Sequence, residues 1–456
     1  MYKFEKGGLI RTAAAKRGGF AYPVYTKEIS GGTFAANSFT DEAWFIPAGE
    51  PVAEALGELA KGPAPEALRA GAAREAEGFA AGLPAQIGFC PTYACNMRCT
   101  YCYQQNNPEL DKRPVTEENL ARFMDYAAGA AAKARAGRPD RPVVLQLFGG
   151  EPFSGGTRPA IKKLFEFCRA HKMHIAATTN GLALNDFFDL LLPYHGYIGK
   201  IGISLDGVGE THDSRRKTAP AESGFARIVA NINILLKAGI HVSVSHTLDS
   251  SNIGRLPEFL RFTGAQGWNG NPLVDLVLSR VDDRKFETGY PAILSEAQLY
   301  KELLALDDKK PFPGNVRLAF LNASLPFAGK LGRTFGHNEN IRERFKYCWA
   351  ASDIYDLVYI DAALDVFRCT CTVGAKEHKI GSLQAGFSLE AWHAHSAWAR
   401  KECAGCPIGG YCRGGCRLSA GKDFDRNCRE EKANFDYLVE HVIAPRLDSL
   451  IQKESL

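Results

Sequence analysis

The segment QIGFCPTYACNMRCTYC, residues 86–102, decides how the rest of the chain can be interpreted. It begins as a strand-like run and ends in three cysteines with the spacing CX3CX2C, at Cys95, Cys99 and Cys102. Three thiolates on one short loop can hold three irons of a [4Fe-4S] cluster and leave the fourth iron open to another ligand. A zinc knuckle is the alternative, but zinc usually takes four ligands and no fourth lies nearby.

Working outward, strand-like and helical segments alternate from residue 86 onward. The strand-like runs are QIGFC (86–90), VVLQLF (143–148), HIAATT (174–179), YIGKIGISL (197–205), HVSVSHTL (241–248) and VDLVLSRV (274–281). Helices are predicted between them at 116–136, 158–171, 184–193, 223–238 and 254–264. Such βα units indicate a parallel sheet, and right-handed crossovers curl it into a barrel. The predicted fold class is therefore α/β, with a partial (β/α)6 TIM-like barrel whose functional loops follow the strand ends.

Other segments flank this barrel. Short β-like pieces and Ala/Glu-rich helical sequence precede it, and a cysteine-rich, loop-like region and a closing helix at about 429–453 follow it. The predicted domains are an N-terminal accessory region (1–85), the barrel (86–282), a bridging segment (283–347), the cysteine-rich region (348–430) and a C-terminal helix (431–456).

Composition narrows the class of protein. The chain has 456 residues, of which 45% are hydrophobic and 23% charged, as in ordinary globular proteins. Its 55 basic and 51 acidic residues nearly balance, which does not favour binding to nucleic acid or to a membrane surface. We see no apolar run long enough to span a membrane and no signal peptide at the charged N-terminus, so we expect a cytoplasmic protein. Thirteen cysteines in such a chain indicate metal or iron–sulfur binding rather than disulfides.

Several motifs stand at the ends of the later strands. Phe148 is followed by the sequence GGEP, and the third strand ends in Thr-Asn-Gly around Asn180. The fourth ends in SLDG at 204–207, followed by HDSRR at 212–216. Each motif alone is typical of a tight turn or a solvated face. Together, in this order and after the CX3CX2C loop, they resemble the radical S-adenosylmethionine (SAM) superfamily.

The resemblance implies a chemistry. In that family the open iron binds SAM, one electron cleaves it, and the resulting 5′-deoxyadenosyl radical abstracts hydrogen from a substrate. Here Glu151 would accept from the SAM ammonium, and Arg216 would suit the SAM carboxylate through its bidentate guanidinium. The SAM contacts that we expect are Tyr101, Gly149, Gly150, Glu151, Asn180, Ser204, Asp206 and Arg216.

A second cysteine pattern, CX2CX5CX3C with one more cysteine downstream, occupies the C-terminal region. It resembles the SPASM domain, a cysteine-rich extension of radical SAM peptide modifiers that holds auxiliary [4Fe-4S] clusters. A zinc ribbon has overlapping CX2C spacing and is the alternative. The resemblance implies three [4Fe-4S] clusters in total, one binding SAM and two auxiliary. One auxiliary cluster would use Cys403, Cys406, Cys412 and Cys428, and the other, nearer the active site, would use Cys348, Cys369 and Cys416.

The chain departs from the SPASM pattern in two places. Leu364 stands five residues before Cys369, where the family usually has glycine, and we therefore expect the turn there to differ. Cys371 is an additional thiol that we favour as the fourth ligand of the nearer cluster. If Cys371 is not a ligand, that cluster would keep an open iron able to bind a substrate thiolate. Because Cys371 decides between these two cases, it is the candidate catalytic residue. The remaining Cys90 and Cys168 are expected to be small buried hydrophobes.

The SPASM resemblance implies a precursor peptide as substrate and a flavodoxin- or ferredoxin-type electron donor. We expect a thioether or other side-chain crosslink in a ribosomally synthesised peptide. The alternatives are formylglycine formation, as in anaerobic sulfatase maturases, or another oxidation or epimerisation of a peptide. Formylglycine formation uses an Asp base after the second SPASM cysteine, where this chain has Thr370. Residues 1–85 would recognise a leader peptide at a sheet edge or simply cap the barrel.

Two other classes of protein remain for comparison. A zinc-binding interaction protein would have no use for the GGEP and SLDG motifs, and an RNA-modifying radical enzyme would need a basic face. An enzyme that acts on a small metabolite is harder to exclude from the sequence, because the same barrel fold serves many reactions. An exposed cluster would make the protein oxygen-sensitive.

Overall fold

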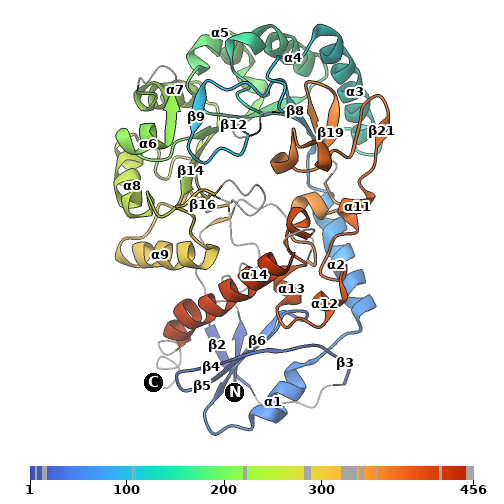
Figure 1. The fold of residues 1–456 in the computed structure, drawn as a ribbon, viewed down its shortest axis with the longest axis vertical. Helices are drawn as coiled ribbons and strands as arrows, with labels where there is room; N and C mark the ends of the chain where they lie inside the picture. Colours follow the sequence, from blue (N-terminus) through green and yellow to red (C-terminus); the bar gives the residue numbers. More distant parts are fainter. Residues whose placement is uncertain are drawn as a thin grey trace.

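The computed structural model describes residues 1–5, 8–12, 18–104, 107, 109–218, 223–281, 289–319, 336–337, 344–355, 357–420 and 424–447. The molecule is elongated, with the βα barrel at one end and a small N-terminal sheet at the other (Figure 1). The cysteine-rich C-terminal region connects the two ends along one side, next to helix α2 (Pro65–Ala80).

The barrel contains the predicted strands. They are β8 (Ala85–Cys90), β10 (Val143–Leu147), β11 (His174–Thr179), β12 (Ile198–Ser204), β14 (Val242–Leu248) and β15 (Val274–Arg280). Each pairs in parallel with the next one in this order, which confirms the α/β partial barrel. Burial alternates along β14, where Val242, Val244 and Leu248 are buried, because successive side chains point to opposite faces of the sheet.

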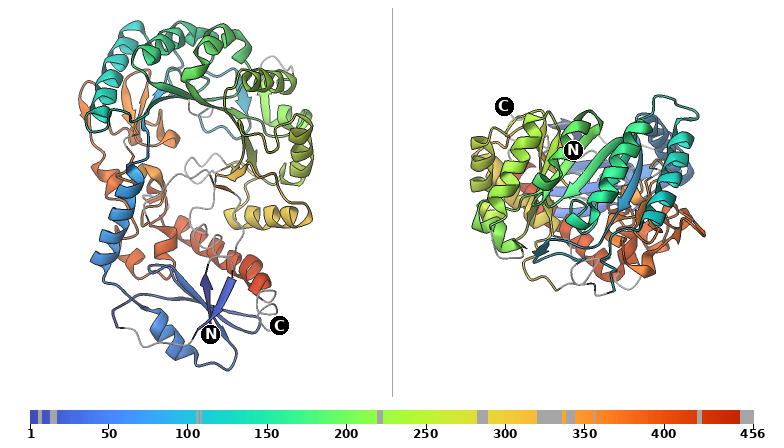
Figure 2. Two further views of the ribbon diagram at one scale, coloured as in Figure 1. Left: turned by 180° about the vertical axis from the view of Figure 1, so that it is seen from behind. Right: turned by 90° about the horizontal axis from the view of Figure 1, so that it is seen from above.

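Helices cover the outside of this sheet, as the view from above shows (Figure 2). The predicted helices appear as α3 (Glu117–Arg135), α4 (Arg158–Ala170), α7 (Phe225–Lys237) and α8 (Leu256–Ala265). The helix predicted at 184–193 is wrong as a single element. It consists of a 3-10 turn at Leu184–Phe187, the one-turn α5 (Phe188–Leu191) and a 3-10 segment at Leu192–Tyr197. Pro193 lacks the N–H that a continuous α-helix needs.

Short strands extend the sheet beyond the barrel on both edges. On the β15 edge lie β16 (Val316–Leu318) and β17 (Gly336–His337), after helix α9 (Glu296–Lys309). On the β8 edge lie β18 (Tyr359–Asp361), β19 (Asp365–Phe367), β20 (Gly381–Ser382) and β21 (Gly386–Phe387). Since β18 pairs in parallel with β8, the cysteine-rich region continues the sheet of the barrel instead of forming a separate layer.

The N-terminal region forms a five-stranded antiparallel sheet in the order β2-β1-β6-β5-β4. Its strands are β1 (Tyr2–Glu5), β2 (Gly8–Arg11), β4 (Tyr25–Ile29), β5 (Gly32–Asn37) and β6 (Glu42–Pro47). Strand β3 (Phe20–Ala21) pairs separately with β7 (Lys61–Gly62). Helix α1 (Val52–Leu59) follows β6. The closing helix begins earlier than predicted, as α14 (Phe424–Leu438), and continues as a π-helix at Val439–Ile443. The predicted end of that helix lies outside the described residues.

Contacts between distant segments join the two ends of the chain. The Tyr25 ring packs edge-on against Phe435 of α14 at 4.8 Å, and the Tyr25 hydroxyl donates to Asp436. Gly410, in α13 (Gly409–Cys412), donates its backbone N–H to Ser38 Oγ at 3.0 Å. A Cβ on Gly410 would lie 2.2 Å from the Ser38 carbonyl oxygen, so this contact requires glycine. The N-terminal sheet is thus packed against the cysteine-rich region.

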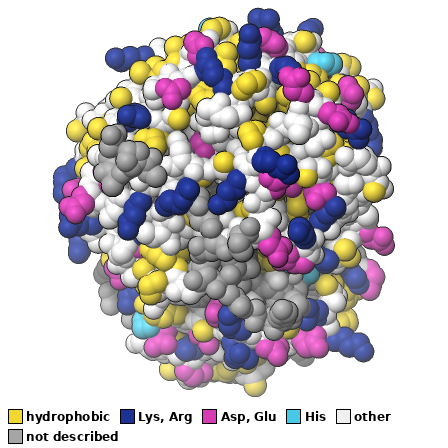
Figure 3. Space-filling view, turned by 45° about the horizontal axis from the view of Figure 1, so that its top comes forward, with side chains coloured by type: hydrophobic (Ala, Val, Ile, Leu, Met, Phe, Trp, Pro, Cys, Tyr) yellow, Lys and Arg dark blue, Asp and Glu magenta, His cyan; other side chains and the backbone are white. Residues whose placement is uncertain are grey.

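The molecular surface carries both signs of charge. Acidic and basic side chains are interspersed over the face shown in Figure 3, outside the grey atoms. None of the described helices is both long enough and apolar enough to cross a membrane.

We expected the turn at Leu364 to differ from the turn that glycine makes in the SPASM family, and this prediction is wrong. The turn between β18 and β19 keeps a backbone conformation typical of glycine. Leu364 adopts φ 69°, in the left-handed region that favours glycine, and its side chain is fully buried. Its N–H donates to the Asp361 carbonyl at 3.0 Å, and the Asp361 carboxylate accepts the N–H groups of Ala363 and Asp365 at 2.9 Å each. The burial of the leucine side chain and these hydrogen bonds offset the backbone strain.

We predict that Leu364→Gly is less destabilising than Leu364→Ala, by about 1 kcal/mol. Both variants lose the buried side chain, at a cost of about 2–5 kcal/mol, but only glycine relieves the left-handed strain. Urea denaturation under anaerobic conditions measures the difference in unfolding free energy. An alanine variant as stable as the glycine variant would show that Leu364 is unstrained.

Candidate functional site

The loop of the first three cysteines lies at the barrel mouth, directly after β8. Strand β9 (Met97–Cys99) of this loop pairs antiparallel with β13 (Arg216–Thr218), and Cys99 stands opposite Arg216. Burial is the main reason that the pKa of the Cys99 thiol is raised to about 12; Arg216 offsets part of this rise, and Asp206, Cys102 and Cys95 add to it. The three thiols therefore lie within electrostatic range of one another, on one loop held beside an arginine.

The GGEP motif packs directly on this loop. Gly150 N–H donates to the Thr92 carbonyl at 3.1 Å, and Glu151 N–H donates to the Ala94 carbonyl at 2.8 Å. A Cβ on Gly150 would lie 2.3 Å from the Ala94 oxygen, and one on Gly149 would lie 2.6 Å from Cys90 Sγ. These glycines are required for the close approach of the two loops.

The Glu151 carboxylate is buried and is already held by the protein. It accepts from Thr179 Oγ1 at 2.6 Å, from Asn180 N–H at 2.7 Å and from Phe153 N–H at 2.9 Å. Burial holds the pKa of Glu151 above its usual value, and these hydrogen bonds and Arg216 offset part of that rise. Because an ionised carboxylate offers about four acceptor positions, one remains for a further donor.

Asn180 connects the end of the third strand to the cysteine loop. Its Nδ2 donates to Asn96 Oδ1 at 2.6 Å and lies 3.6 Å from Cys95 Sγ. Its Oδ1 accepts from Leu182 N–H at 2.9 Å. The side chain thus contacts a predicted cluster ligand. Ser204 ends β12 and stands in register with Ser245 of β14.

Tyr101, Asp206 and Arg216 form one buried group. The Tyr101 hydroxyl donates to Asp206 and accepts from Arg216 Nη1 at 2.6 Å. Arg216 Nη1 also lies 3.6 Å from the Asp206 carboxylate, which is fully buried. Burial raises the pKa of Asp206, but Arg216 and Arg215 outweigh it, so the pKa lies below its usual value. Asp206 is therefore a charged group that positions Tyr101 and Arg216.

A neighbouring network was missed from the sequence. Arg215 donates to Asp249 at 2.6 Å and to Ser251 Oγ at 2.7 Å, and its guanidinium lies 5.2 Å from the centre of the Tyr101 ring. Tyr290 donates to the same Asp249 carboxylate at 2.8 Å. Two features of the sequence could have indicated this network: the adjacent arginines in HDSRR and the aspartate directly after the fifth strand.

The group around Arg216 fits SAM by its donor chemistry. Arg216 Nε is buried and has no hydrogen-bond partner among the described residues, so its N–H is available to donate to a carboxylate. The single remaining acceptor position of Glu151 suits an ammonium group. Cys95, Cys99 and Cys102 supply the thiolates that an iron–sulfur cluster requires. These observations support the predicted roles, which remain proposals.

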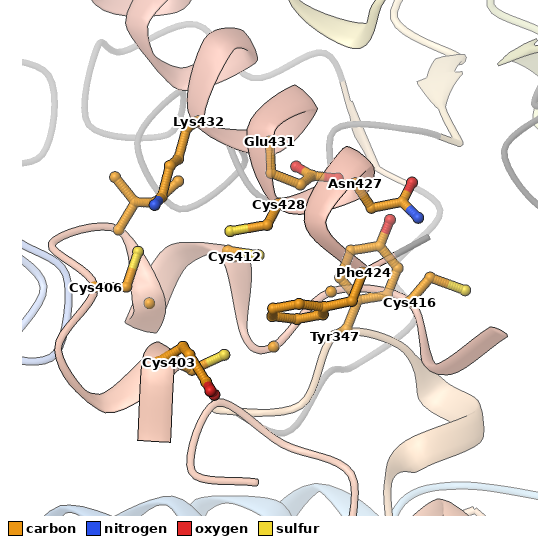
Figure 4. Close-up of a pocket in the computed structure, with 15 residues that line it drawn as sticks. Tyr347, Cys403, Cys406, Cys412, Cys416, Phe424, Asn427, Cys428, Glu431 and Lys432 are labelled. Carbon is orange, nitrogen blue, oxygen red and sulfur yellow. The ribbon is translucent and has the colours of Figure 1, made fainter. Parts of the chain in front are cut away.

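The C-terminal cysteines line a pocket between the loop that begins at α12 (Lys401–Ala404) and helix α14. Figure 4 shows the sulfurs of Cys403, Cys406, Cys412 and Cys428 around a common space, whereas the Cys416 sulfur points away from it. Burial, followed by the charges of Cys406 and Cys428, raises the pKa of Cys403 to about 11. Four thiols thus gather here, although the described residues contain no three Cys, His, Asp or Glu side chains placed to hold a single metal ion.

Cys369 and Cys371 flank Thr370, which contacts the first cysteine loop at the barrel mouth. The Tyr103 hydroxyl donates to the carbonyl of the intervening Thr370 at 3.1 Å. Burial, Cys369 and Cys371 together raise the pKa of Tyr359, whose ring lies 5.7 Å from Trp349, the residue after Cys348.

The two remaining cysteines are buried, as predicted. Cys90 and Cys168 are each 0% exposed, and burial raises the pKa of the Cys168 thiol to about 12. Cys168 packs in the hydrophobic core from α4.

Comparison with known proteins agrees with this geometry. Residues 89–262 match the family model of the Radical SAM superfamily, so the chain carries a radical SAM domain. That family implies SAM and a [4Fe-4S] cluster. Beyond this domain, the similarity to solved structures concerns the fold.

Curated relatives share part of the chain. They include a GTP 3′,8-cyclase of Rhizobium leguminosarum (26% identity, 47% of this chain, 59% of that one) and a serine-type anaerobic sulfatase-maturating enzyme of Bacteroides thetaiotaomicron (25%, 42% and 46%). Another is the subtilosin biosynthesis protein AlbA of Bacillus subtilis (27%, 41% and 39%). The matched region covers less than two thirds of each of these relatives.

Solved structures share the fold over more of the chain. Native anSMEcpe with bound AdoMet superposes with a TM-score of 0.57 at 17% identity, covering 80% of this chain and 99% of that one. Streptococcus suis SuiB bound to precursor peptide SuiA gives a TM-score of 0.52 at 13% identity, covering 88% and 96%. At these identities the likeness concerns the fold alone.

We predict that Arg216→Lys weakens SAM binding about tenfold in the anaerobically reconstituted protein. Lysine keeps the charge but cannot make the forked contact to a carboxylate, and a tenfold loss corresponds to about 1.4 kcal/mol. Equilibrium binding of SAM measures the effect, with the exposed neighbour Lys217→Ala as control. Equal affinity in wild type and Arg216→Lys would remove Arg216 from the SAM site.

We also predict that His212 makes stability depend on pH. It accepts the Asp206 N–H at 3.2 Å, and burial lowers its pKa to about 4. The unfolded histidine takes up a proton near pH 6.5, whereas the folded one stays neutral until about pH 4. The stability that neutral His212 contributes is therefore fully present above pH 6.5 and is lost as pH falls towards 4. Between pH 6 and pH 5, wild type should lose about 1.2 kcal/mol more unfolding free energy than His212→Asn, which keeps an acceptor. Parallel pH profiles would contradict this.

Proposed function

We propose that this chain is a radical SAM enzyme with a C-terminal SPASM domain that modifies a side chain of a ribosomally synthesised peptide. The observation that carries the proposal is the pocket of four cysteines in the same chain as the radical SAM domain. SAM bound at its cluster supplies hydrogen-atom abstraction from a substrate carbon. The protein's own residues bind SAM, orient it and close the site around it.

The residues of the barrel mouth divide this work. Asp206 fixes Tyr101 and Arg216, so that the Arg216 guanidinium is held for the SAM carboxylate. Glu151 is held by three donors and presents one remaining acceptor position to the SAM ammonium. Asn180 contacts Cys95 and so ties this part of the site to the cluster loop.

The C-terminal region would hold two auxiliary [4Fe-4S] clusters. Cys403, Cys406, Cys412 and Cys428 share one pocket, which supports one cluster there. The Cys416 sulfur points out of that pocket, which is compatible with a role in the other cluster beside Cys348 and Cys369. Cys371 is proposed as the fourth ligand of this nearer cluster. If Cys371 does not bind there, the cluster would keep an open iron.

A peptide substrate is supported by the peptides bound to the structural neighbours. SuiB was solved with precursor peptide SuiA, and anSMEcpe was solved with a peptide named Cp18Cys. We propose a thioether or other side-chain crosslink as the product. Formylglycine formation is the less favoured alternative, because Thr370 stands where that reaction uses an aspartate base, and its backbone carbonyl accepts from Tyr103.

The N-terminal sheet is proposed to recognise a leader peptide. Strand β2 lies at one end of the sheet order, next to β1, and the Ile10 side chain on it is 51% exposed. An extended peptide can add to such an edge as another strand. The alternative expected from the sequence, a plain cap on the barrel, does not fit the position of this sheet at the opposite end of the molecule (Figure 1). The contacts of Tyr25 and Ser38 support a structural role towards the C-terminal region instead. A flavodoxin- or ferredoxin-type donor and a cytoplasmic location complete the proposal.

Iron content tests the proposal directly. We expect about twelve irons per anaerobically reconstituted chain, falling to about eight in a Cys95/Cys99/Cys102→Ala variant, because each cluster holds four. A Cys403/Cys406→Ala variant should also fall to about eight. Iron and acid-labile sulfide per chain are the measurements.

The control is Cys168→Ala, which removes a buried thiol outside the proposed sites and should keep about twelve irons. About four irons in wild type, falling to none in the triple variant and accompanied by zinc, would leave the radical SAM site but reject the SPASM clusters. In the same series, Cys371→Ala with an unchanged peptide product and rate would exclude an essential role for that thiol.

A further inference from the structure

Tyr103 connects the two cysteine loops that face each other at the barrel mouth. It directly follows Cys102, the last cysteine of the SAM-cluster loop. Its hydroxyl donates to the backbone carbonyl of Thr370 at 3.1 Å, across 267 residues of sequence. Thr370 lies between Cys369 and Cys371, so one side chain spans from one predicted cluster loop to the middle of the other.

The segment that receives this hydrogen bond is a compact turn. Thr372 N–H and Thr372 Oγ1 both bond to the Cys369 carbonyl, at 2.9 and 2.7 Å, and Val373 N–H bonds to the Thr370 carbonyl at 3.4 Å. The Thr370 carbonyl thus accepts from its own turn and from Tyr103. Removing the Tyr103 hydroxyl would leave the turn with only its local bond at this carbonyl.

A second tyrosine joins the same two regions at a different place. Tyr93 donates its hydroxyl to the buried Asp361 carboxylate at 2.8 Å. Asp361 belongs to the β18–β19 turn, outside the cysteine segment. General docking of the cysteine-rich region on the barrel can therefore be separated from the contact at Thr370.

We propose that Tyr103 is a positioning residue that sets the Cys369–Cys371 segment relative to the SAM-cluster loop. The contact fixes where the ligands of the nearer auxiliary site stand with respect to the barrel mouth, where the peptide would react. The hydrogen bond between Tyr103 and Thr370 does not depend on the proposed function. Only its effect on peptide modification rests on that function.

The test compares Tyr103→Phe with Tyr93→Phe in the full chain. Each variant removes one hydroxyl and one hydrogen bond between the same two regions, and keeps the ring. In Tyr103→Phe we expect amide hydrogen exchange of Thr372, Val373 and Ala375 to rise about fivefold, the effect of losing one typical hydrogen bond. In Tyr93→Phe the increase should fall on Ala363 and Asp365 instead.

Spectroscopy of the anaerobically reconstituted protein supplies the second readout. Tyr103→Phe should keep the iron content and peptide-independent SAM cleavage of wild type, but change the EPR spectrum of the nearer auxiliary cluster and slow peptide modification. Tyr93→Phe should leave that EPR spectrum unchanged.

Either of two results would overturn the proposal: wild-type exchange and EPR spectra in Tyr103→Phe, or the same changes in both variants. If wild type takes up no auxiliary iron, the proposed function fails, while hydrogen exchange still decides the role of Tyr103.

Discussion

The buried charge of Asp206 is the constraint on which the barrel mouth depends. Removing a carboxylate from water is costly unless charged partners and hydrogen bonds replace the lost solvation. Asp206 obtains them from Tyr101, from Arg216 and from the N–H of Thr247 at 3.0 Å. Tyr101 belongs to the cysteine loop and Arg216 to the strand paired with it. Satisfying one buried charge therefore fixes the position of the loop that would hold the cluster.

A second constraint attaches the cysteine-rich region to this mouth. Strand β18 pairs with β8, whose C-terminal end leads into the cysteine loop, so backbone hydrogen bonds set the register between the two regions. The left-handed Leu364 then reverses the chain into β19, which leads to Cys369. As a result, Cys369 and Cys371 come to lie beside Tyr103 without a long, flexible connection.

The sequence predicted the parts of this arrangement that repeat locally. The barrel strands and four of the five helices follow from alternating apolar runs, and the motifs at the strand ends converge because parallel strands end at one edge. Strands β16, β17 and β18 have two or three residues each, and pairing at long range rather than a local pattern creates them. Arg215 was missed because its partner Asp249 is 34 residues away and is recognisable only in the folded chain.

The state of the thiols connects folding to cofactor binding. Burial and mutual repulsion raise the pKa of Cys99 and Cys403, so without metal these side chains are neutral thiols at pH 7. Iron binds thiolates, so assembly of a cluster at either of these proposed sites would release protons and would become less favourable as pH falls. The same packing that excludes water from the cysteines makes the thiolate form unfavourable until the metal supplies the compensating positive charge. Cluster binding and the packing of the cysteine loops are therefore expected to stabilise each other.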